Sequence, residues 1–121
     1  MTQSTVQYRD QTTGEVFRER CERRILHTPN LMTVVIDFNN GPWDVADPMH
    51  SHPHEQITYI AEGELMFLAD GQEPRRIQAG DLFAVPSGQP HSVQLLSKSA
   101  RLIDSFNPIR KDFLKPWDSP Q

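Results

Sequence analysis

Residues 49–68, MHSHPHEQITYIAEGELMFL, combine a histidine-rich segment with two segments of strand character. Gln56–Ile60 and Glu64–Leu68 are rich in β-branched, aromatic and other apolar residues, and Ala61-Glu62-Gly63 separates them. Because glycine adopts a positive φ at little cost, this spacing predicts a β-hairpin with its turn at Gly63. The histidines then lie directly before the first strand of the hairpin.

The same pattern continues along most of the chain and predicts an all-β fold. Short apolar segments recur about every ten residues and end at turn-forming residues, which is typical of a β-sandwich or β-barrel. The further predicted strands are 31–38, 75–78, 82–85, 93–96 and 101–106, and only 110–114 is compatible with a helical turn. Residues 1–14 and 115–121 are polar or proline-rich and are expected to be irregular.

Length and charge restrict the classes of function. The 121 residues suffice for one domain, 1–121, with one core. Lys and Arg total 12 against 16 Asp and Glu, so no basic surplus favours a nucleic-acid partner. No apolar run approaches the roughly 20 residues that cross a bilayer, and no export signal is visible, so we expect a cytoplasmic protein without a membrane partner. The single cysteine, Cys21, excludes an internal disulfide and is expected to be a packing residue.

Four side chains are candidate metal ligands. In an extended segment residues i and i+2 face the same side, so His50 and His52 can converge on one ion. Gln56 lies four residues beyond His52 and can face the same way, and His91 can supply a third imidazole. Imidazole is a common ligand for transition metals, so these residues predict one divalent ion, with Ni, Zn, Fe, Mn and Co all compatible.

The remaining two histidines and the two tryptophans are expected to have other roles than metal binding. Pro53 interrupts the extended segment before His54, and three adjacent ligands would be crowded, so His54 is expected at the rim of the site. His27 lies in a stretch of alternating apolar residues and is expected to be structural. Trp43 and Trp117 are compatible with an interface or a lid.

These residues form two motifs that resemble those of the cupin family. The motifs read His50-x-His52-x3-Gln56-x6-Gly63 and Gly80-x5-Pro86-x-Gly88-x2-His91, separated by 16 residues. Gln56 stands where the family usually has Glu, and Leu95 replaces the final Asn of the second motif. The resemblance implies a small single-domain β-barrel, the double-stranded jelly roll, with a metal inside. It also implies a homodimer, which in this family often exchanges N-terminal strands.

Gln56 affects the expected chemistry. A neutral amide ligand leaves the metal a stronger Lewis acid and a poorer centre for redox cycling than a carboxylate would. This favours a site that polarises a substrate oxygen over a dioxygenase.

Residues 102–114 narrow the resemblance to the KdgF-type pectin-degradation cupins. Asp104 to Leu114 match the pattern Asp-x-Phe-x-Pro-x-Arg-x-Asp-Phe-Leu at every named position, and the similarity extends over about residues 17–114. That family converts 4,5-unsaturated monouronates, released from pectin or alginate by lyases, into linear 5-keto-4-deoxyuronates. The resemblance therefore implies a ring-opening enzyme with a small sugar acid as substrate, and leaves its pectin or alginate origin open.

The resemblance also suggests roles for individual residues. Asp104, in an apolar interior, would have a raised pKa that suits acid–base catalysis. Arg110 offers a fork that matches a substrate carboxylate. Phe106 is expected to form an apolar wall against the sugar, with core packing as the next alternative. Tyr59 could donate a hydrogen bond, and core packing suits it equally.

Three alternatives remain at this point. One is another cupin enzyme, an iron-dependent dioxygenase or a sugar isomerase. The second is a non-enzymatic, metal-dependent sugar-binding or sensor module. The third is a cupin with a vestigial site, against which the complete set of four ligands argues.

Overall fold

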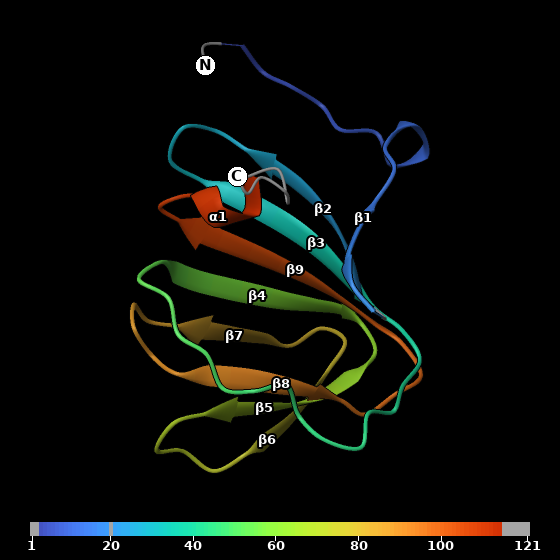
Figure 1. Cartoon of the computed structure of the whole chain (residues 1–121), viewed down its shortest axis with the longest axis vertical. Helices are drawn as coiled ribbons and strands as arrows, with labels where there is room; N and C mark the ends of the chain where they lie inside the picture. Colours follow the sequence, from blue (N-terminus) through green and yellow to red (C-terminus); the bar gives the residue numbers. More distant parts are fainter. Residues whose placement is uncertain (1–2, 20, 115–121) are drawn as a thin grey trace.

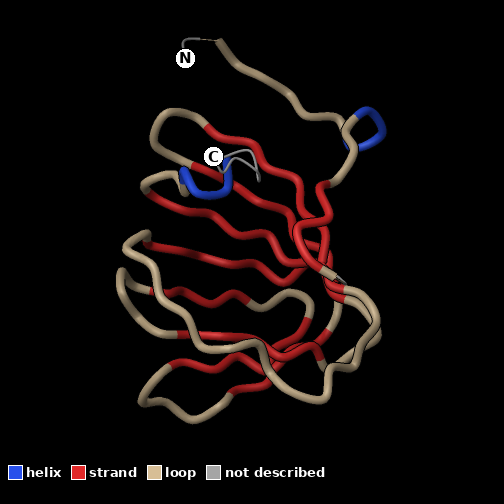
Figure 2. Tube along the Cα trace, viewed as in Figure 1, coloured by secondary structure: helices blue, strands red, loops and turns tan. Residues whose placement is uncertain are grey.

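The computed structural model describes residues 3–19 and 21–114, which form two antiparallel sheets (Figure 1). The six-stranded sheet has the order β1 (Glu15–Arg18), β2 (Cys21–His27), β3 (Met32–Phe38), β9 (Ala100–Asn107), β4 (Glu55–Glu62), β7 (Leu82–Val85). The three-stranded sheet has the order β6 (Arg75–Gln78), β5 (Glu64–Ala69), β8 (His91–Leu95). The described helices are single turns, η1 (Arg9–Gln11) and α1 (Lys111–Leu114), so the predicted all-β class is confirmed (Figure 2).

The predicted hairpin is present as β4 and β5, joined at Gly63 with a φ of +95°. A side chain at Gly63 would collide with the backbone of Ser99 and Ala100, so the turn needs glycine for space as well as for conformation. The other predicted strands are also present, within two residues at each end. β1 and β2 were not predicted as strands, because β1 has only four residues and Glu22, Arg23 and Arg24 put three consecutive charged residues into β2.

The predicted closed barrel needs a correction. Among the described residues, the strand pairing forms two separate sheets and does not continue from one sheet into the other. The chain changes sheets at Ala79-Gly80-Asp81, since β6 pairs with β5 whereas β7 pairs with β4. The two sheets still share one apolar core, to which Phe38, Ile60 and Leu65 belong, and this arrangement is consistent with a jelly roll.

The inner face of the large sheet changes character along its strands. On β4 and β9 every second residue is buried, which is the periodicity of a strand with one face toward the core. Ile60 and Leu102 pair across the two strands and lie in the apolar core, whereas Thr58 and Asp104 pair next to them and are polar. A buried polar region therefore begins where the apolar core ends.

The histidine segment is not a strand, contrary to the prediction from its alternation. His50 forms one isolated bridge with His91, through backbone hydrogen bonds of 3.1 and 2.9 Å, and residues 51–54 form a loop before β4. Pro53 cannot donate a backbone hydrogen bond to a neighbouring strand, which accounts for the break.

Trp43 is neither a lid nor an exposed interface residue in this chain. Its ring is buried beside Phe38, with centroids 5.0 Å apart, and its Nε1 donates to the carbonyl of Asn39 at 3.3 Å. Cys21 is buried in the same cluster, as expected of a packing residue. Trp117 lies outside the described residues. Within the described chain we find no helix with the length and apolar character needed to span a membrane.

Candidate active site

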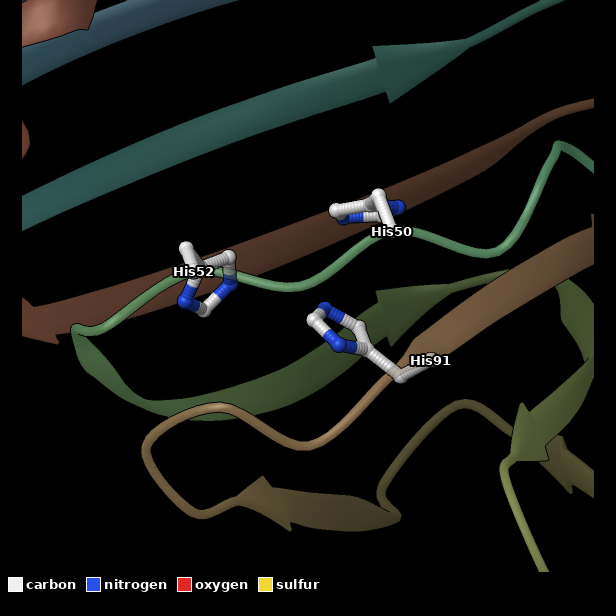
Figure 3. Close-up of side chains that lie close together, drawn as sticks. All are labelled: His50, His52 and His91. Carbon is white, nitrogen blue, oxygen red and sulfur yellow. The ribbon is translucent and has the colours of Figure 1, made fainter.

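Three histidines converge at the end of the polar region (Figure 3). His50 and His52 come from the loop before β4, and His91 is the first residue of β8. One ring nitrogen from each lies within 4.8 Å of those of the other two. The His91 ring centroid lies 4.4 Å from that of His50 and 5.0 Å from that of His52. The structure thus brings together the three imidazoles that the sequence suggested, with His50 and His52 on a loop rather than on one strand.

Backbone carbonyls orient these rings. Nδ1 of His52 lies 2.9 Å from the carbonyl oxygen of His54, and Nδ1 of His91 lies 2.9 Å from that of Gln89. Nδ1 of His50 lies 3.5 Å from the carbonyl oxygen of Pro48. A carbonyl can only accept, so we assign the ring hydrogen of His50 and His91 to Nδ1, which leaves Nε2 with a free lone pair. This is the usual arrangement of metal-binding histidines, in which the second ring nitrogen donates to a backbone or carboxylate oxygen. In His52 both ring nitrogens face an acceptor, the carbonyl of His54 and Oε1 of Gln56, and the one hydrogen of a neutral ring can serve only one of them.

Gln56 adds an oxygen to this cluster. Its Oε1 lies 3.0 Å from Nε2 of His52, and both side chains are buried. When the His52 hydrogen lies on Nδ1, two lone pairs face each other across this distance. A cation between the two atoms would remove this repulsion, so the donor set fits a metal ion. Nitrogen and amide oxygen donors suit the borderline divalent transition metals.

The protonation of the cluster also suits a metal. Burial lowers the pKa of His91 from 6.5 to about 4, and burial lowers that of His50 as well. Both imidazoles are therefore neutral near pH 7, which is the form that binds metal ions.

A chain of hydrogen bonds leads from the histidines to a buried carboxyl group. Gln56 Nε2 donates to Thr58 Oγ1 at 2.9 Å, and Thr58 Oγ1 donates to Asp104 Oδ1 at 2.6 Å. Thr58 has no exposed surface, and Asp104 is 6% exposed. Strands β4 and β9 position these residues, since Thr58 and Asp104 are register partners.

Burial raises the pKa of Asp104 from 3.8 to about 6, although the hydrogen bond from Thr58 and the charge of Arg110 act in the opposite direction. A carboxyl group with such a pKa exists in both protonation states near neutral pH. It can therefore accept and return a proton during a reaction.

Arg110 lies at the same end of the sheet, just before α1. Its guanidinium carbon lies 4.0 Å from the ring centroid of Phe113 and 5.3 Å from that of Phe106. Nε and Nη2 donate to Asp112 at 3.4 and 2.9 Å, and the side chain is 16% exposed. Two aromatic rings and one carboxylate thus hold the guanidinium in place.

One cavity of about 300 Å³ joins these groups. The predicted site residues among its lining are His50, Gln56, His91, Asp104, Phe106 and Arg110. Most of the remaining lining is apolar, from strands such as β3 and β7. The arrangement offers a metal site, an acid–base group and a cation on the wall of one small cavity.

Tyr59 does not join this site, which corrects the expectation of a substrate contact. It is 41% exposed and points away from the cavity, because Gln56, Thr58 and Ile60 occupy the inner face of β4. His54 is half-buried beside His52, with ring centroids 5.7 Å apart, and is not part of the histidine cluster.

Several residues of the site were not recognised in the sequence, among them Thr58 and Arg23. Thr58 could have been found, because it follows Gln56 by two positions on the same strand and must share its face. Arg23 lines the cavity together with Arg18 and Asp47, and its guanidinium carbon lies 4.2 Å from the ring centroid of Phe113. Nothing in its charged sequence neighbourhood distinguishes it from a surface arginine.

Comparisons with known proteins agree with this geometry. Residues 41–106 match the model of the cupin domain. The chain is 32% identical over 106 residues to the pectin degradation protein KdgF of Dickeya dadantii (strain 3937), covering 87% of this chain and 94% of that protein.

Solved structures of cupins are also similar to this chain. The structure of KdgF from Halomonas sp. superimposes with a TM-score of 0.79 at 31% identity, over 88% of this chain and 96% of that one. An RmlC-like cupin from Shewanella frigidimarina NCIMB 400 gives a TM-score of 0.81 at 32% identity, over 92% and 96% of the two chains.

Proposed function

This chain belongs to the cupin family as a KdgF-like member, and from that premise we propose that it is an enzyme that linearises 4,5-unsaturated monouronates. The observation that carries the proposal is the buried Asp104, which faces the same cavity as the histidine cluster and a guanidinium group. A guanidinium group and a metal would suffice for binding, and a carboxyl group whose pKa burial raises to about 6 supports acid–base chemistry in addition.

The proposed reaction is an isomerisation. The substrate is a cyclic enol ether with a hemiacetal at C1, a double bond between C4 and C5, and a carboxylate. The C1 hydroxyl loses its proton, the bond between C1 and the ring oxygen breaks, and C4 gains a proton. The product has an aldehyde at C1 and a ketone at C5. One proton moves from oxygen to carbon, and no oxidant or water is consumed.

We assign this proton transfer to Asp104. In its ionised form it accepts the proton, and in its protonated form it returns it, which its pKa of about 6 allows near neutral pH. Positioned acid–base groups contribute rate factors of about 100 to 10,000.

We propose that His50, His52, Gln56 and His91 hold one divalent transition metal ion. When bound, it would supply a Lewis acid that polarises a substrate oxygen. The neutral amide of Gln56 favours this role over redox chemistry, which weakens the dioxygenase alternative. The donor set is compatible with Ni, Zn, Fe, Mn and Co.

Arg110 and the cavity define the substrate. Asp112 accepts from Nε and Nη2 of Arg110, and the other edge of the guanidinium, Nη1 and Nη2, can bind a substrate carboxylate through two parallel hydrogen bonds. Phe106 supplies an apolar wall beside it. A cavity of about 300 Å³ lies at the small end of the range for ligand sites, which suits a single sugar ring rather than an oligosaccharide.

Product analysis tests this function. We would incubate the metal-loaded protein with an unsaturated monouronate in D₂O and follow the reaction by proton NMR. The proposal predicts loss of the olefinic C4 signal and incorporation of one deuterium at C4 in a linear product. Oxygen uptake would identify a dioxygenase instead, and binding without turnover would identify a sensor or binding module.

Replacing Arg110 with lysine is expected to raise KM for the monouronate about tenfold or more, with a smaller change in kcat. Lysine keeps the charge but loses the planar fork and the stacking on Phe106 and Phe113. Steady-state kinetics of the variant measures both constants. Arg101→Lys, which alters an ion pair with Asp37 elsewhere, is the matched control. An unchanged KM in Arg110→Lys would remove the carboxylate-binding role.

We also propose that the outer face of the large sheet forms the homodimer interface. Ile57, Tyr59 and Leu82 are 55%, 41% and 62% exposed, and Tyr59 pairs with Leu82 across β4 and β7. Ile103 and Val35 continue the same row on β9 and β3. Ile103 and Val35 are half-buried, and together with the exposed side chains they form an apolar row of the kind that marks an association surface, which a second copy would bury.

Tyr59→Glu is therefore expected to shift the mass measured by light scattering from twice the 13.9 kDa chain to the single chain. The added charge would be buried against the partner without a counter-charge. Val45→Glu, at a 74% exposed loop position, should leave the mass unchanged. A monomeric wild-type protein would refute the proposed interface.

A further inference from the structure

We propose that Thr58 is a positioning residue that turns the amide oxygen of Gln56 toward the metal site and fixes which oxygen of Asp104 exchanges the proton. The second half of this inference rests on the proposed function, whereas the first half concerns metal binding alone. The feature that carries both is the single hydrogen of the Thr58 hydroxyl, placed between an amide and a carboxyl group.

The direction of the chain follows from the hydrogen-bonding capacity of each group. A hydroxyl has one hydrogen to donate, and an ionised carboxylate can only accept. Thr58 Oγ1 lies 2.6 Å from Asp104 Oδ1, and with the carboxylate ionised only the Thr58 hydroxyl can donate between them, so the Thr58 hydrogen is used there. Thr58 Oγ1 is then available to its other neighbour only as an acceptor.

This determines the orientation of the Gln56 side chain. Its amide group lies 2.9 Å from Thr58 Oγ1, and only the NH₂ end can donate to that acceptor. The carbonyl end therefore faces Nε2 of His52, at 3.0 Å. The reversed amide would place two acceptors against each other next to Thr58 and an NH₂ group at the metal site, where it cannot act as a ligand. Thr58 thus selects the orientation in which Gln56 can bind a metal.

The same hydroxyl gives the two carboxyl oxygens of Asp104 different roles. Oδ1 accepts the hydrogen bond from Thr58, and a proton added there would compete with that bond. Oδ2 carries no such bond, and Asp104 is among the residues that line the cavity. Oδ2 is therefore the oxygen that accepts the proton from the substrate and returns it.

Two substitutions separate the hydroxyl from the shape of the side chain. Thr58→Val keeps the branched shape and removes the hydroxyl, and Thr58→Ser keeps the hydroxyl and removes the methyl group. Metal affinity is measured by calorimetric titration of metal-free protein with Zn²⁺ and with Ni²⁺, a readout that does not depend on activity. Turnover is measured with the unsaturated monouronate, as kcat and KM separately.

We expect Thr58→Val to bind both ions about 10 to 100 times more weakly, the range for loss of a residue that orients a ligand. Its kcat should fall by at least tenfold with little change in KM, because carboxylate binding by Arg110 is untouched. Thr58→Ser should remain within about threefold of the wild type in metal affinity, kcat and KM, because serine keeps the hydroxyl that orients Gln56. Thr33→Val removes a threonine hydroxyl that contacts Ser105 on the neighbouring strands and should change none of them.

Unchanged metal affinity and kcat in Thr58→Val would overturn the proposal. Equal losses in Thr58→Val and Thr58→Ser would also overturn it, because they would assign the effect to packing. If valine disturbs folding, the pair Thr58→Ser and Thr58→Ala gives the same comparison, since both lack the methyl group. Weakened metal binding in Thr58→Val together with a wild type inactive on uronates would refute the proposed function while supporting the role in metal binding.

Discussion

Replacing Asp104 with asparagine is expected to lower kcat on an unsaturated monouronate by about 100- to 10,000-fold, the contribution of a positioned acid–base group. Asparagine has nearly the same shape and can still accept the hydrogen bond from Thr58, but it cannot take up a proton at Oδ2. The metal content should remain at one ion per chain. Initial rates and elemental analysis of the same sample provide both values.

The variant should fold at least as well as the wild type. Burial raises the pKa of Asp104 from 3.8 to about 6, so ionisation of this group destabilises the fold. The penalty is absent below pH 3.8, develops between pH 3.8 and about 6, and reaches about 3 kcal/mol above that pH. Asparagine carries no such penalty, and a thermal melt at pH 8 should show a Tm no lower than that of the wild type.

The pH dependence of the wild type supplies a second test of Asp104. If its carboxylate accepts the proton, kcat/KM should rise as the pH increases through about 6 and then level off. Asp37→Asn, which removes a carboxylate paired with Arg101 on the sheet, is the control and should keep both rate and profile. Full activity in Asp104→Asn, or loss of its metal, would contradict the role assigned to Asp104.

The second large effect is expected for His91→Ala. This change removes one of four proposed ligands, from a position where the ring is held by the carbonyl of Gln89. We expect the affinity for a divalent transition metal to fall by more than about 100-fold, beyond the loss seen for residues that only support a ligand. Calorimetric titration of metal-free protein measures this, and turnover should fall to the level of chelator-treated wild type.

His27→Ala is a matched control for this experiment. His27 also places Nδ1 near a backbone carbonyl, that of Thr28 at 2.8 Å, but it lies on β2 outside the histidine cluster. The His27→Ala variant should bind metal with the affinity of the wild type. If His91→Ala retained one equivalent of metal at wild-type affinity, the proposed centre would be wrong.

The sequence predicted the strands best where local signals were strong. The hairpin of β4 and β5 is marked by two apolar segments around Gly63, and both the segments and the turn are present. β2 lacked such a signal, because three of its residues, Glu22, Arg23 and Arg24, are consecutive and charged. Pairing between sheets depends on contacts distant in sequence, which explains why the open arrangement was not foreseen.

The sequence identified the histidines of the site better than the residues that surround them. The motif spacing identified the three histidines that converge, because only a few residue types bind metals. Tyr59 was placed wrongly, although Gln56 and Tyr59 are three residues apart and such residues face opposite sides of a strand. Arg23 lines the cavity beside Phe113, a contact between residues distant in sequence that no local pattern reveals.

The central claim is that this chain opens the ring of an unsaturated monouronate at a metal-dependent site. The most direct measurement is the loss of ultraviolet absorbance of the C4=C5 bond in freshly prepared unsaturated monogalacturonate, with metal-loaded and chelator-treated protein beside the spontaneous reaction. The account predicts a clear acceleration by the metal-loaded protein, which chelation abolishes and added metal restores. A fully metal-loaded protein that leaves the spontaneous rate unchanged would contradict it.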